Sequence, residues 1–399
     1  MSPDTSARAV RHPTAARYGP ELRVLIVGGG VAGLTLAALL EQRGFAPVVV
    51  ERQTSYSDPG SVLGLWPAGS RVLKGLGVFR ELLSVGLECT NYKVASAAGE
   101  VLHSYSLTPL ADRYGPPINV YRPDLIALLR SAVSPDRLRF GVTVRDVTES
   151  PSGAVAAFDD GTSETFDVIV GCDGLRSSMR QLVFGDATLS YSGMTGWGIT
   201  CPATFVPPRE VIEYWGAGKF FGVYPARDRL CAFAGLRAPA SAPDPVEGRI
   251  GRLRKEFREF GGLVPAVLRA LDRPEEIVHE DYMDIRMDAW YRGRVVLIGN
   301  AAHAVLGTGG LGASLAMESA AVLADELCRT DSSRVRLAFE LYAVRRRARV
   351  DHVLAWSRRL GKLMYTGNRF VARLRDGAMQ FAADEQLLAP MEQVLAERL

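Results

Sequence analysis

The 399-residue sequence is poor in the residue types that carry most nucleophilic and metal-binding chemistry. Its five cysteines, at positions 89, 172, 201, 231 and 328, have neither the spacing of a zinc site nor that of a disulfide framework. Its five histidines are scattered at positions 12, 103, 279, 303 and 352, and neither G-x-S-x-G nor H-E-x-x-H occurs. We therefore expect no bound metal, no catalytic side chain of the nucleophile type and a reducing, cytoplasmic location.

The sequence also lacks long apolar runs and a large excess of charge of one sign. The most apolar run, Val295 to Leu306, is too short to cross a bilayer and contains Asn300 and His303. The net charge is +3, with 47 basic against 44 acidic residues, so no nucleic-acid partner is expected. Residues 1–20 lack the apolar core of a secretion signal and are expected to form a disordered tail, although arginine-containing, acid-poor starts also occur in organelle transit peptides.

What the sequence does contain is a glycine-rich signature, Gly28-Gly-Gly-Val-Ala-Gly33. An apolar run from Leu22 to Val27, typical of a buried parallel strand, precedes it, and a helical stretch from Val31 to Arg43 follows. Gly28 allows the tight turn, Gly30 lets the backbone approach a pyrophosphate, and Gly33 lets the helix pack closely on the strand. The signature therefore predicts a dinucleotide whose phosphates lie at the helix N-terminus.

An acidic residue follows at the position where such sites bind a ribose. The second predicted strand, Pro47 to Val50, leads into Glu51. A carboxylate there can accept hydrogen bonds from the two hydroxyls of an adenosine ribose. It favours a ribose without a 2′-phosphate.

Two further signatures follow predicted buried strands much later in the chain. Gly171-Cys-Asp-Gly174 carries Asp173, and Gly299-Asn-Ala-Ala-His303 carries Asn300. Each alone is also compatible with a purely structural strand and turn. Open α/β sheets bind ligands at the carboxyl ends of their strands, so together the three signatures predict one bound dinucleotide.

In this order, the three signatures resemble those of the FAD-dependent monooxygenases of the aromatic-hydroxylase type, the family of p-hydroxybenzoate hydroxylase. The resemblance covers roughly Leu22 to Met364 and includes the segments Gly60 to Leu73 and Val120 to Leu125. Tyr342, Arg345, Arg346 and Arg349 resemble the pattern of the family's long C-terminal helix. The resemblance implies an α/β fold: a discontinuous Rossmann-like FAD-binding domain, a second, antiparallel-sheet substrate domain and a long C-terminal helix.

The domain boundaries follow from the resemblance and from changes in the sequence pattern along the chain. We expect an FAD-binding domain of residues 21–76, 114–186 and 283–330, a substrate domain of residues 77–113 and 187–282, and a C-terminal helical region of residues 331–399. Alternating patterns at 142–147, 154–158 and 162–166 predict antiparallel strands, and 250–271 is predicted to be helical. The arginines of the predicted helix 335–363 are interpreted as a solvated face rather than as a site for an anionic partner.

The resemblance implies FAD as cofactor, NADPH or NADH as co-substrate, and dioxygen. The residues expected to contact FAD are Gly28, Gly30, Val31, Ala32, Gly33, Glu51, Arg52, Gly64, Arg122, Asp173, Asn300, Gly310, Leu311, Gly312 and Ala313. The chain departs from the family at Asn300, where aspartate is usual, and at Leu306, Gly307 and Leu311, where the family has proline, proline and glutamine. The amide oxygen of Asn300 can still accept a hydrogen bond from the ribityl chain.

The predicted substrate domain is rich in aromatic residues that fit a pocket wall. Trp197, Trp215, Phe221 and Tyr224, together with Leu306, are expected to contact the substrate. Because Leu306 and Leu311 make the wall near the flavin apolar, a lipophilic aromatic or isoprenoid substrate is favoured over a small benzoate. In the family, the reduced flavin reacts with dioxygen to a flavin 4a-hydroperoxide that hydroxylates or epoxidises the substrate. We expect a monomer or homodimer.

Two alternatives remain open at this point. A flavin dehydrogenase or reductase related to the geranylgeranyl reductases shares the flavin signatures and does not use dioxygen. A flavin-binding protein without turnover is compatible with Asn300 and Leu311. A flavin halogenase is disfavoured, because Gly196-Trp-Gly-Ile-Thr200 lacks the double-tryptophan motif of that group.

Overall fold

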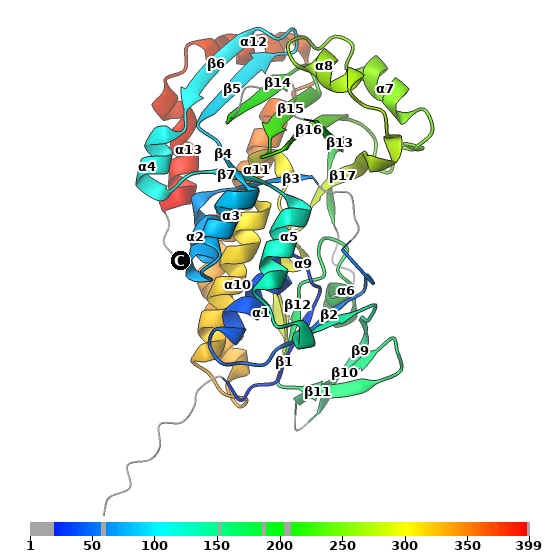
Figure 1. Cartoon of the computed structure of the whole chain (residues 1–399), viewed down its shortest axis with the longest axis vertical. Helices are drawn as coiled ribbons and strands as arrows, with labels where there is room; N and C mark the ends of the chain where they lie inside the picture. Colours follow the sequence, from blue (N-terminus) through cyan, green and yellow to red (C-terminus); the bar gives the residue numbers. More distant parts are fainter. Residues whose placement is uncertain (1–19, 57–60, 151–152, 186–188, 203–208, 397–399) are drawn as a thin grey trace, which may run out of the picture.

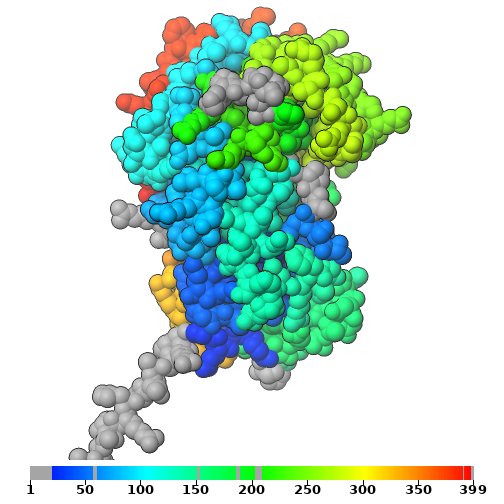
Figure 2. Space-filling model, in the orientation of Figure 1, coloured from blue at the N-terminus to red at the C-terminus, as the bar shows by residue number. Residues whose placement is uncertain are grey.

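The computed structural model describes residues 20–56, 61–150, 153–185, 189–202 and 209–396. The predicted tail lies outside these residues, apart from Pro20. The chain forms a lower lobe around a mostly parallel sheet and an upper lobe around a larger sheet (Figure 1). Figure 2 shows the cyan and yellow-green segments, from two separate stretches of the sequence, gathered in the upper lobe.

The sheet of the lower lobe has the strand order β18-β19-β12-β1-β2-β8. Its strands are β18 (Tyr291–Arg292), β19 (Val295–Leu297), β12 (Val168–Gly171), β1 (Val24–Val27), β2 (Val48–Glu51) and β8 (Leu138–Phe140). All neighbouring pairs are parallel except β18 with β19. The central strands β1 and β12 are rich in Val, Ile and Leu, because both faces of the sheet are covered, by helices such as α1 (Val31–Glu41) and by the strand β10 (Gly153–Phe158), which contacts β12.

Six short helices of this lobe follow strands in the sequence. They are α1 (Val31–Glu41), α2 (Pro67–Gly75), α3 (Phe79–Val85), α5 (Arg122–Ser131), α6 (Ser178–Phe184) and α9 (Asn300–His303). The predicted antiparallel strands form a separate sheet of β9 (Val144–Ser150), β10 (Gly153–Phe158) and β11 (Ser163–Phe166), as expected.

The upper lobe contains a seven-stranded sheet of order β17-β13-β16-β15-β14-β5-β6. Its strands are β17 (Val278–Asp284), β13 (Ser190–Pro202), β16 (Arg229–Arg237), β15 (Lys219–Pro225), β14 (Glu210–Trp215), β5 (Asn91–Ser96) and β6 (Val101–Ser106). All pairs are antiparallel except β14 with β5, which come from different stretches of the chain and so need no hairpin between them. Between the lobes lies a small sheet of β3 (Val62–Leu65), β7 (Ile118–Tyr121) and β4 (Leu87–Glu88) (Figure 1).

The outer face of the upper sheet is covered by two short helices, α7 (Arg249–Glu256) and α8 (Val264–Arg269). The prediction of one helix over 250–271 is therefore wrong. Gly261 and Gly262 interrupt it: Gly262 has a φ of +58°, and a β-carbon on Gly261 would lie 2.1 Å from the Ala98 carbonyl oxygen. The chain turns at these glycines to pack against β5 and β6.

The chain ends in α10 (Gly312–Cys328), α11 (Val335–Met364), α12 (Arg369–Gln380) and α13 (Asp384–Ala396); α4 (Thr108–Tyr114) packs against α13. Figure 1 shows α10 and α11 side by side along the lower lobe. None of the helices in the described ranges is both long enough and apolar enough to span a membrane.

The interpretation of the α11 arginines as a solvated face is wrong for Arg346 and Arg349, because Glu318 of α10 is buried opposite them. Arg346 lies 2.9 Å from the Glu318 carboxylate, and Arg349 donates two hydrogen bonds to it, of 2.5 and 2.6 Å. All three side chains are almost completely buried. Although burial raises the pKa of Glu318, Arg349 and Arg346 bring it below its usual value.

Other arginines of α11 also have specific partners. Arg345 pairs with Asp325 and Glu326 on α10, at 2.6 and 2.5 Å. Arg347 lies 4.0 Å from the centre of the Trp290 ring. The arginines of α11 therefore hold this helix against the lower lobe.

Replacing Glu318 tests whether the buried ion pairs hold α10 and α11 together. Glu318→Ala leaves two guanidinium groups buried without their carboxylate, so we expect the free energy of unfolding to fall by about 3–5 kcal/mol. Chemical denaturation measures it. Arg336→Gln, which breaks an exposed pair with Glu340, is the control and should cost about 1 kcal/mol or less. Equal losses in the two variants would show that the buried network does not hold the helices together.

Candidate functional site

The three glycine-rich signatures lie along one edge of the lower sheet. They follow β1, β12 and β19, which are adjacent and parallel. Glu51 ends β2, the next strand on the other side of β1. The four segments, far apart in the sequence, therefore meet at the carboxyl end of one sheet, where such folds bind their ligands.

The first signature has the geometry of a dinucleotide turn. Gly28 has a φ of +110°, and a β-carbon there would lie 2.7 Å from the Cys172 carbonyl oxygen. A β-carbon on Gly33 would lie 2.0 Å from the Gly28 carbonyl oxygen, so only glycine lets α1 approach β1 this closely. At Gly30 nothing lies within 4 Å of the same position. This open space is where a pyrophosphate would meet the first N–H groups of α1, at Val31 and Ala32.

Glu51 is held against this turn. Its carboxylate accepts hydrogen bonds from the Gly29 N–H at 2.8 Å and the Gln53 N–H at 3.0 Å. Tyr56, which the sequence did not single out, donates to the Gly29 carbonyl oxygen at 2.7 Å. Burial and the nearby Glu51 carboxylate raise the pKa of Tyr56 to about 12, so it remains a hydrogen-bond donor. Arg52 is exposed.

The second signature caps its own helix. The Asp173 carboxylate accepts hydrogen bonds from the Ser177 hydroxyl at 2.5 Å, the Ser178 hydroxyl at 3.0 Å and the Met179 N–H at 3.0 Å, at the start of α6. Arg180 donates to the Ala301 carbonyl oxygen at 3.0 Å, which joins the second signature to the third. The carboxylate of Asp173 is thus engaged in shaping the loop after β12.

The third signature packs against the first. A β-carbon on Gly299, which has a φ of +60°, would lie 3.1 Å from the Ala32 side chain and 3.4 Å from that of Ala316. Helices α1 and α10 therefore meet at this glycine. Asn300, the first residue of α9, is exposed, so its amide is accessible to a ligand at the sheet edge.

The remaining expected FAD contacts lie around the start of α10. Gly310 is in the left-handed region, with a φ of +62°, and α10 begins at Gly312 and Ala313, which are half-buried. A β-carbon on Gly64 of β3 would lie 3.8 Å from the Gly310 carbonyl oxygen. Leu311 differs from its neighbours, since its side chain is buried in the core of the lower lobe.

Arg122 begins α5 beside this region. Its N–H donates to the Ser61 carbonyl oxygen at 2.9 Å, which connects α5 to the start of β3. Arg122 is half-buried, and its guanidinium has no hydrogen-bond or ion-pair partner among the residues that the structure describes. A phosphate or ribityl oxygen fits such a group.

The predicted substrate-contacting residues divide between the two faces of the upper sheet. Trp215 and Leu306 belong to one apolar cluster on the face toward the lower lobe, the inner face, and Tyr224 packs against it. Phe221 and Trp197 belong to the cluster under α7 and α8, on the outer face. Side chains alternate along a strand, and Phe221 and Tyr224 are three residues apart on β15, so they point to opposite faces.

The inner face also carries a buried carboxylate that the sequence analysis missed. Glu213 accepts hydrogen bonds from the Tyr224 hydroxyl at 2.6 Å and the Trp215 indole N–H at 2.9 Å. Burial raises the pKa of Glu213, and these hydrogen bonds oppose the rise. The signal in the sequence was a second carboxylate, three residues after Glu210, among the apolar residues of β14.

A cavity of ≈ 490 Å³ opens beside the inner face. Leu306, Met194 and Tyr365 supply its apolar wall. Its charged residues are Arg237, Asp284, Arg358 and Lys362. Arg358 donates to both carboxylate oxygens of Asp284, at 2.6 Å each.

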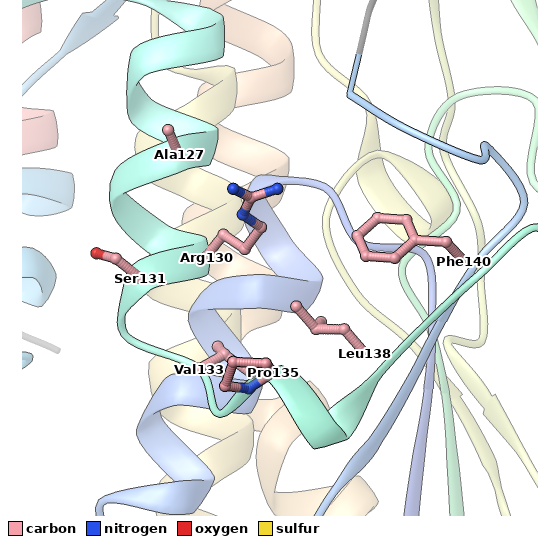
Figure 3. Close-up of a pocket in the computed structure, with 7 residues that line it drawn as sticks. All are labelled: Ala127, Arg130, Ser131, Val133, Pro135, Leu138 and Phe140. Atoms are coloured by element: carbon pink, nitrogen blue, oxygen red, sulfur yellow. The ribbon is translucent and has the colours of Figure 1, made fainter.

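A second cavity, of ≈ 390 Å³, lies between α5 and β8. Figure 3 shows Arg130 extending from α5 toward Phe140 at its wall. The Arg130 guanidinium is also 5.9 Å from the centre of the Tyr56 ring, which packs edge-on against Phe140. This cavity therefore adjoins the Glu51 end of the glycine turn.

His303 is fully enclosed in the third signature. Its Nε2 lies 3.0 Å from the Ser319 hydroxyl, and its ring packs on Trp290. Burial and the nearby Arg346 lower the pKa of His303 from 6.5 to about 3. The imidazole is therefore neutral at pH 7 and a weak base, which suits a packing role.

From the lowered pKa of His303 we predict how the free energy of unfolding depends on pH. The folded state favours the neutral imidazole, so the contribution of His303 is present above pH 6.5 and is lost as the pH falls toward 3. His303→Gln removes this titration. The free energy of unfolding should then change less steeply between pH 6 and pH 4, by about 1.4 kcal/mol per pH unit at most. Denaturation at several pH values, with the exposed His352→Gln as control, measures it; an unchanged slope would contradict the burial of a neutral imidazole.

Two glycine variants separate folding from cofactor binding. Gly33→Ala forces α1 away from β1, and we expect the flavin-free protein to lose roughly 1–3 kcal/mol of stability. Gly30→Ala meets no protein atom, so it should cost that stability only about 1 kcal/mol or less, as a poorer N-cap of α1, while raising the Kd for FAD about tenfold, which is 1.4 kcal/mol. Thermal unfolding without flavin and titration with FAD measure the two effects. Normal FAD binding by Gly30→Ala would place the pyrophosphate elsewhere.

Comparison with known proteins identifies the family of the chain. The profile of the FAD binding domain family matches residues 21–357. The chain is 33% identical over 322 residues to 3-amino-4-hydroxybenzoate 2-monooxygenase of Streptomyces cremeus, covering 76% of this chain and 78% of that protein. It is 29% identical over 345 residues to 2-heptyl-3-hydroxy-4(1H)-quinolone synthase of Pseudomonas aeruginosa strain PAO1, covering 86% and 89%.

The fold is also similar to a solved structure. The crystal structure of Klebsiella pneumoniae HpxO complexed with FAD and uric acid superposes with a TM-score of 0.89 at 23% identity, covering 96% of this chain and 99% of that one. The family match spans most of the chain, from before β1 to near the end of α11. The chain therefore belongs to the FAD binding domain family and is an FAD-dependent monooxygenase.

Proposed function

We propose that the enzyme hydroxylates or epoxidises a lipophilic aromatic or isoprenoid-type small molecule, with NADPH or NADH as reductant and dioxygen as oxidant. The observation that carries this proposal is the inner face of the upper sheet. Trp215, Phe220 and Tyr365 form an aromatic surface there, and Leu306, from the loop before α10, packs against it. This wall is apolar where it meets the expected position of the flavin ring, which favours an apolar ring system as ligand.

The relatives support an aromatic substrate. Their names specify an aminohydroxybenzoate in one case and a quinolone with a heptyl chain in the other. The second combines a heteroaromatic ring with a long alkyl group, which is the type of compound that the inner face suits.

FAD, when bound, supplies the electron transfer and the activation of dioxygen. The residues that would hold it are those of the sheet edge: the N-terminal turn of α1 at the pyrophosphate, Glu51 at the ribose and Arg122 beside the nucleotide. The first N–H groups of α10, at Gly312 and Ala313, form the positive end of a 17-residue helix. They would stabilise negative charge on the flavin ring.

The inner face would position the substrate and exclude water. Leu306 and Tyr365 are nearly completely buried, and Gly309 lies under the Trp356 ring, so the loop before α10 is closely packed. Exclusion of water protects a reactive oxygen species from loss as hydrogen peroxide. Glu213 accepts a hydrogen bond from the Tyr224 hydroxyl and so fixes the direction of this hydroxyl in the wall.

An assay of coupled turnover tests the proposal. The purified yellow protein should oxidise NADPH or NADH rapidly only with dioxygen and an alkyl-substituted aromatic compound present, and isotope-labelled dioxygen should contribute one oxygen atom to the product. Consumption of reductant without any dependence on dioxygen would overturn the proposal.

Leu306→Ser should uncouple the reaction, because a hydroxyl replaces apolar surface at the wall. We expect more hydrogen peroxide per NAD(P)H and a loss of substrate affinity of roughly 1–2 kcal/mol. Leu337→Ser, at an exposed leucine of α11, is the matched control. An equal peroxide ratio in both variants would place Leu306 away from the reacting oxygen.

A further inference from the structure

Helix α12 has one buried face, and the contacts of that face fix its orientation. Ala372, Arg375 and Met379 are buried against the upper lobe. Arg375 donates to the Leu363 and Met364 carbonyl oxygens, at 3.1 Å each, and to the Trp215 carbonyl oxygen at 3.3 Å. It therefore caps the end of α11 and holds α12 at the end of the molecule, beside β6 (Figure 1).

The opposite face of α12 is apolar and exposed. Phe370, Leu374 and Phe381 follow one another at helical spacing and are 69%, 59% and 90% exposed, with Val371 beside them at 45%. Leu363, at the end of α11, is 47% exposed. Exposed apolar residues are ordinary when scattered, whereas an aligned group of this kind marks an interaction surface. We call Phe370, Val371, Leu374 and Phe381 the α12 surface.

Basic side chains flank the α12 surface. Arg369 and Arg373 lie next to it on α12, and both are exposed. The nearest carboxylates are mostly engaged: Asp376 pairs with Arg375 at 2.7 Å, and Asp384 with His103 at 2.8 Å. Exposed Glu385 lies one helix further on.

We propose that the α12 surface binds the protein to an anionic lipid surface. An apolar face with aromatic residues, flanked by arginines on a short helix, is the arrangement that lies in the headgroup region of a bilayer. The arginines complement the negative charge of the lipid headgroups. A second copy of the chain fits less well, because a two-fold interface would bring two sets of the same arginines to one contact surface. The inference is independent of the proposed substrate.

Sedimentation with lipid vesicles tests the proposal. The full-length, flavin-loaded protein is mixed at low salt with vesicles of phosphatidylcholine alone or of phosphatidylcholine with phosphatidylserine. We expect binding to the phosphatidylserine vesicles that weakens as salt is added, because the screening of charge increases. Phe370→Ser with Phe381→Ser should lower the partition coefficient about tenfold or more, since two apolar side chains no longer enter the lipid.

Charge variants and a matched control complete the test. Arg369→Gln with Arg373→Gln should remove the preference for phosphatidylserine, about fivefold per arginine. Val344→Ser is the control, because Val344 is 75% exposed among arginines of α11, away from α12. Retention of flavin shows that each variant is folded.

Three results would overturn the proposal. The first is no sedimentation of the wild type with phosphatidylserine vesicles at low salt, and the second is an equal loss in the Val344→Ser control. The third is a wild-type dimer that does not bind vesicles and becomes a monomer in the phenylalanine variant, which would assign the α12 surface to a second copy. Turnover is not needed for any of these measurements, so their outcome is separate from that of the monooxygenase assay.

Discussion

The buried ion pairs of Glu318 are the interaction on which the lower lobe depends. The negative charge of a buried carboxylate must be balanced by nearby positive charge. Arg346 and Arg349 can both reach Glu318 only when α10 and α11 lie in this relative position. Helix α10 in turn contacts α1 at Gly299 and α2 at Gly69, where a β-carbon would lie 2.7 Å from the Ser314 hydroxyl oxygen. The ion pairs with α11 and the close packing against α1 and α2 thus fix the position of the start of α10, beside the expected flavin ring.

The cofactor edge, the carboxyl end of the lower sheet where FAD is expected, could be predicted from the sequence because its constraints are local. A strand, a turn that needs glycine at positive φ and a helix that needs glycine for close contact are all encoded within a few residues, as at Gly28 and Gly33. The order of the three signatures then identified the fold, and the parallel neighbours β1, β12 and β19 confirm it. The contacts of FAD itself stay predictions.

What the sequence could not predict depends on distant partners. The arginines of α11 have the spacing of a solvated face, and only the position of Glu318 on another helix shows that Arg346 and Arg349 are buried. In the same way, aromatic content alone did not separate Trp215 and Tyr224 from Trp197 and Phe221, because the two faces of the upper sheet are both covered. The alternation along β15 contained that information for Phe221 and Tyr224, since residues three apart in a strand face opposite ways.

The separation of the three signatures also affects how the chain folds as it is made. Strand β1 emerges early, but its neighbour β12 follows only after β3 to β11, and β19 only after the whole upper sheet. Pairings between such distant segments are slow to form, because the intervening chain must first be ordered. All strands of the upper sheet precede β19 in the sequence and so leave the ribosome before it. The cofactor edge is therefore the last part of the lower sheet to close, and FAD binds a site that exists only once synthesis has passed the start of α10.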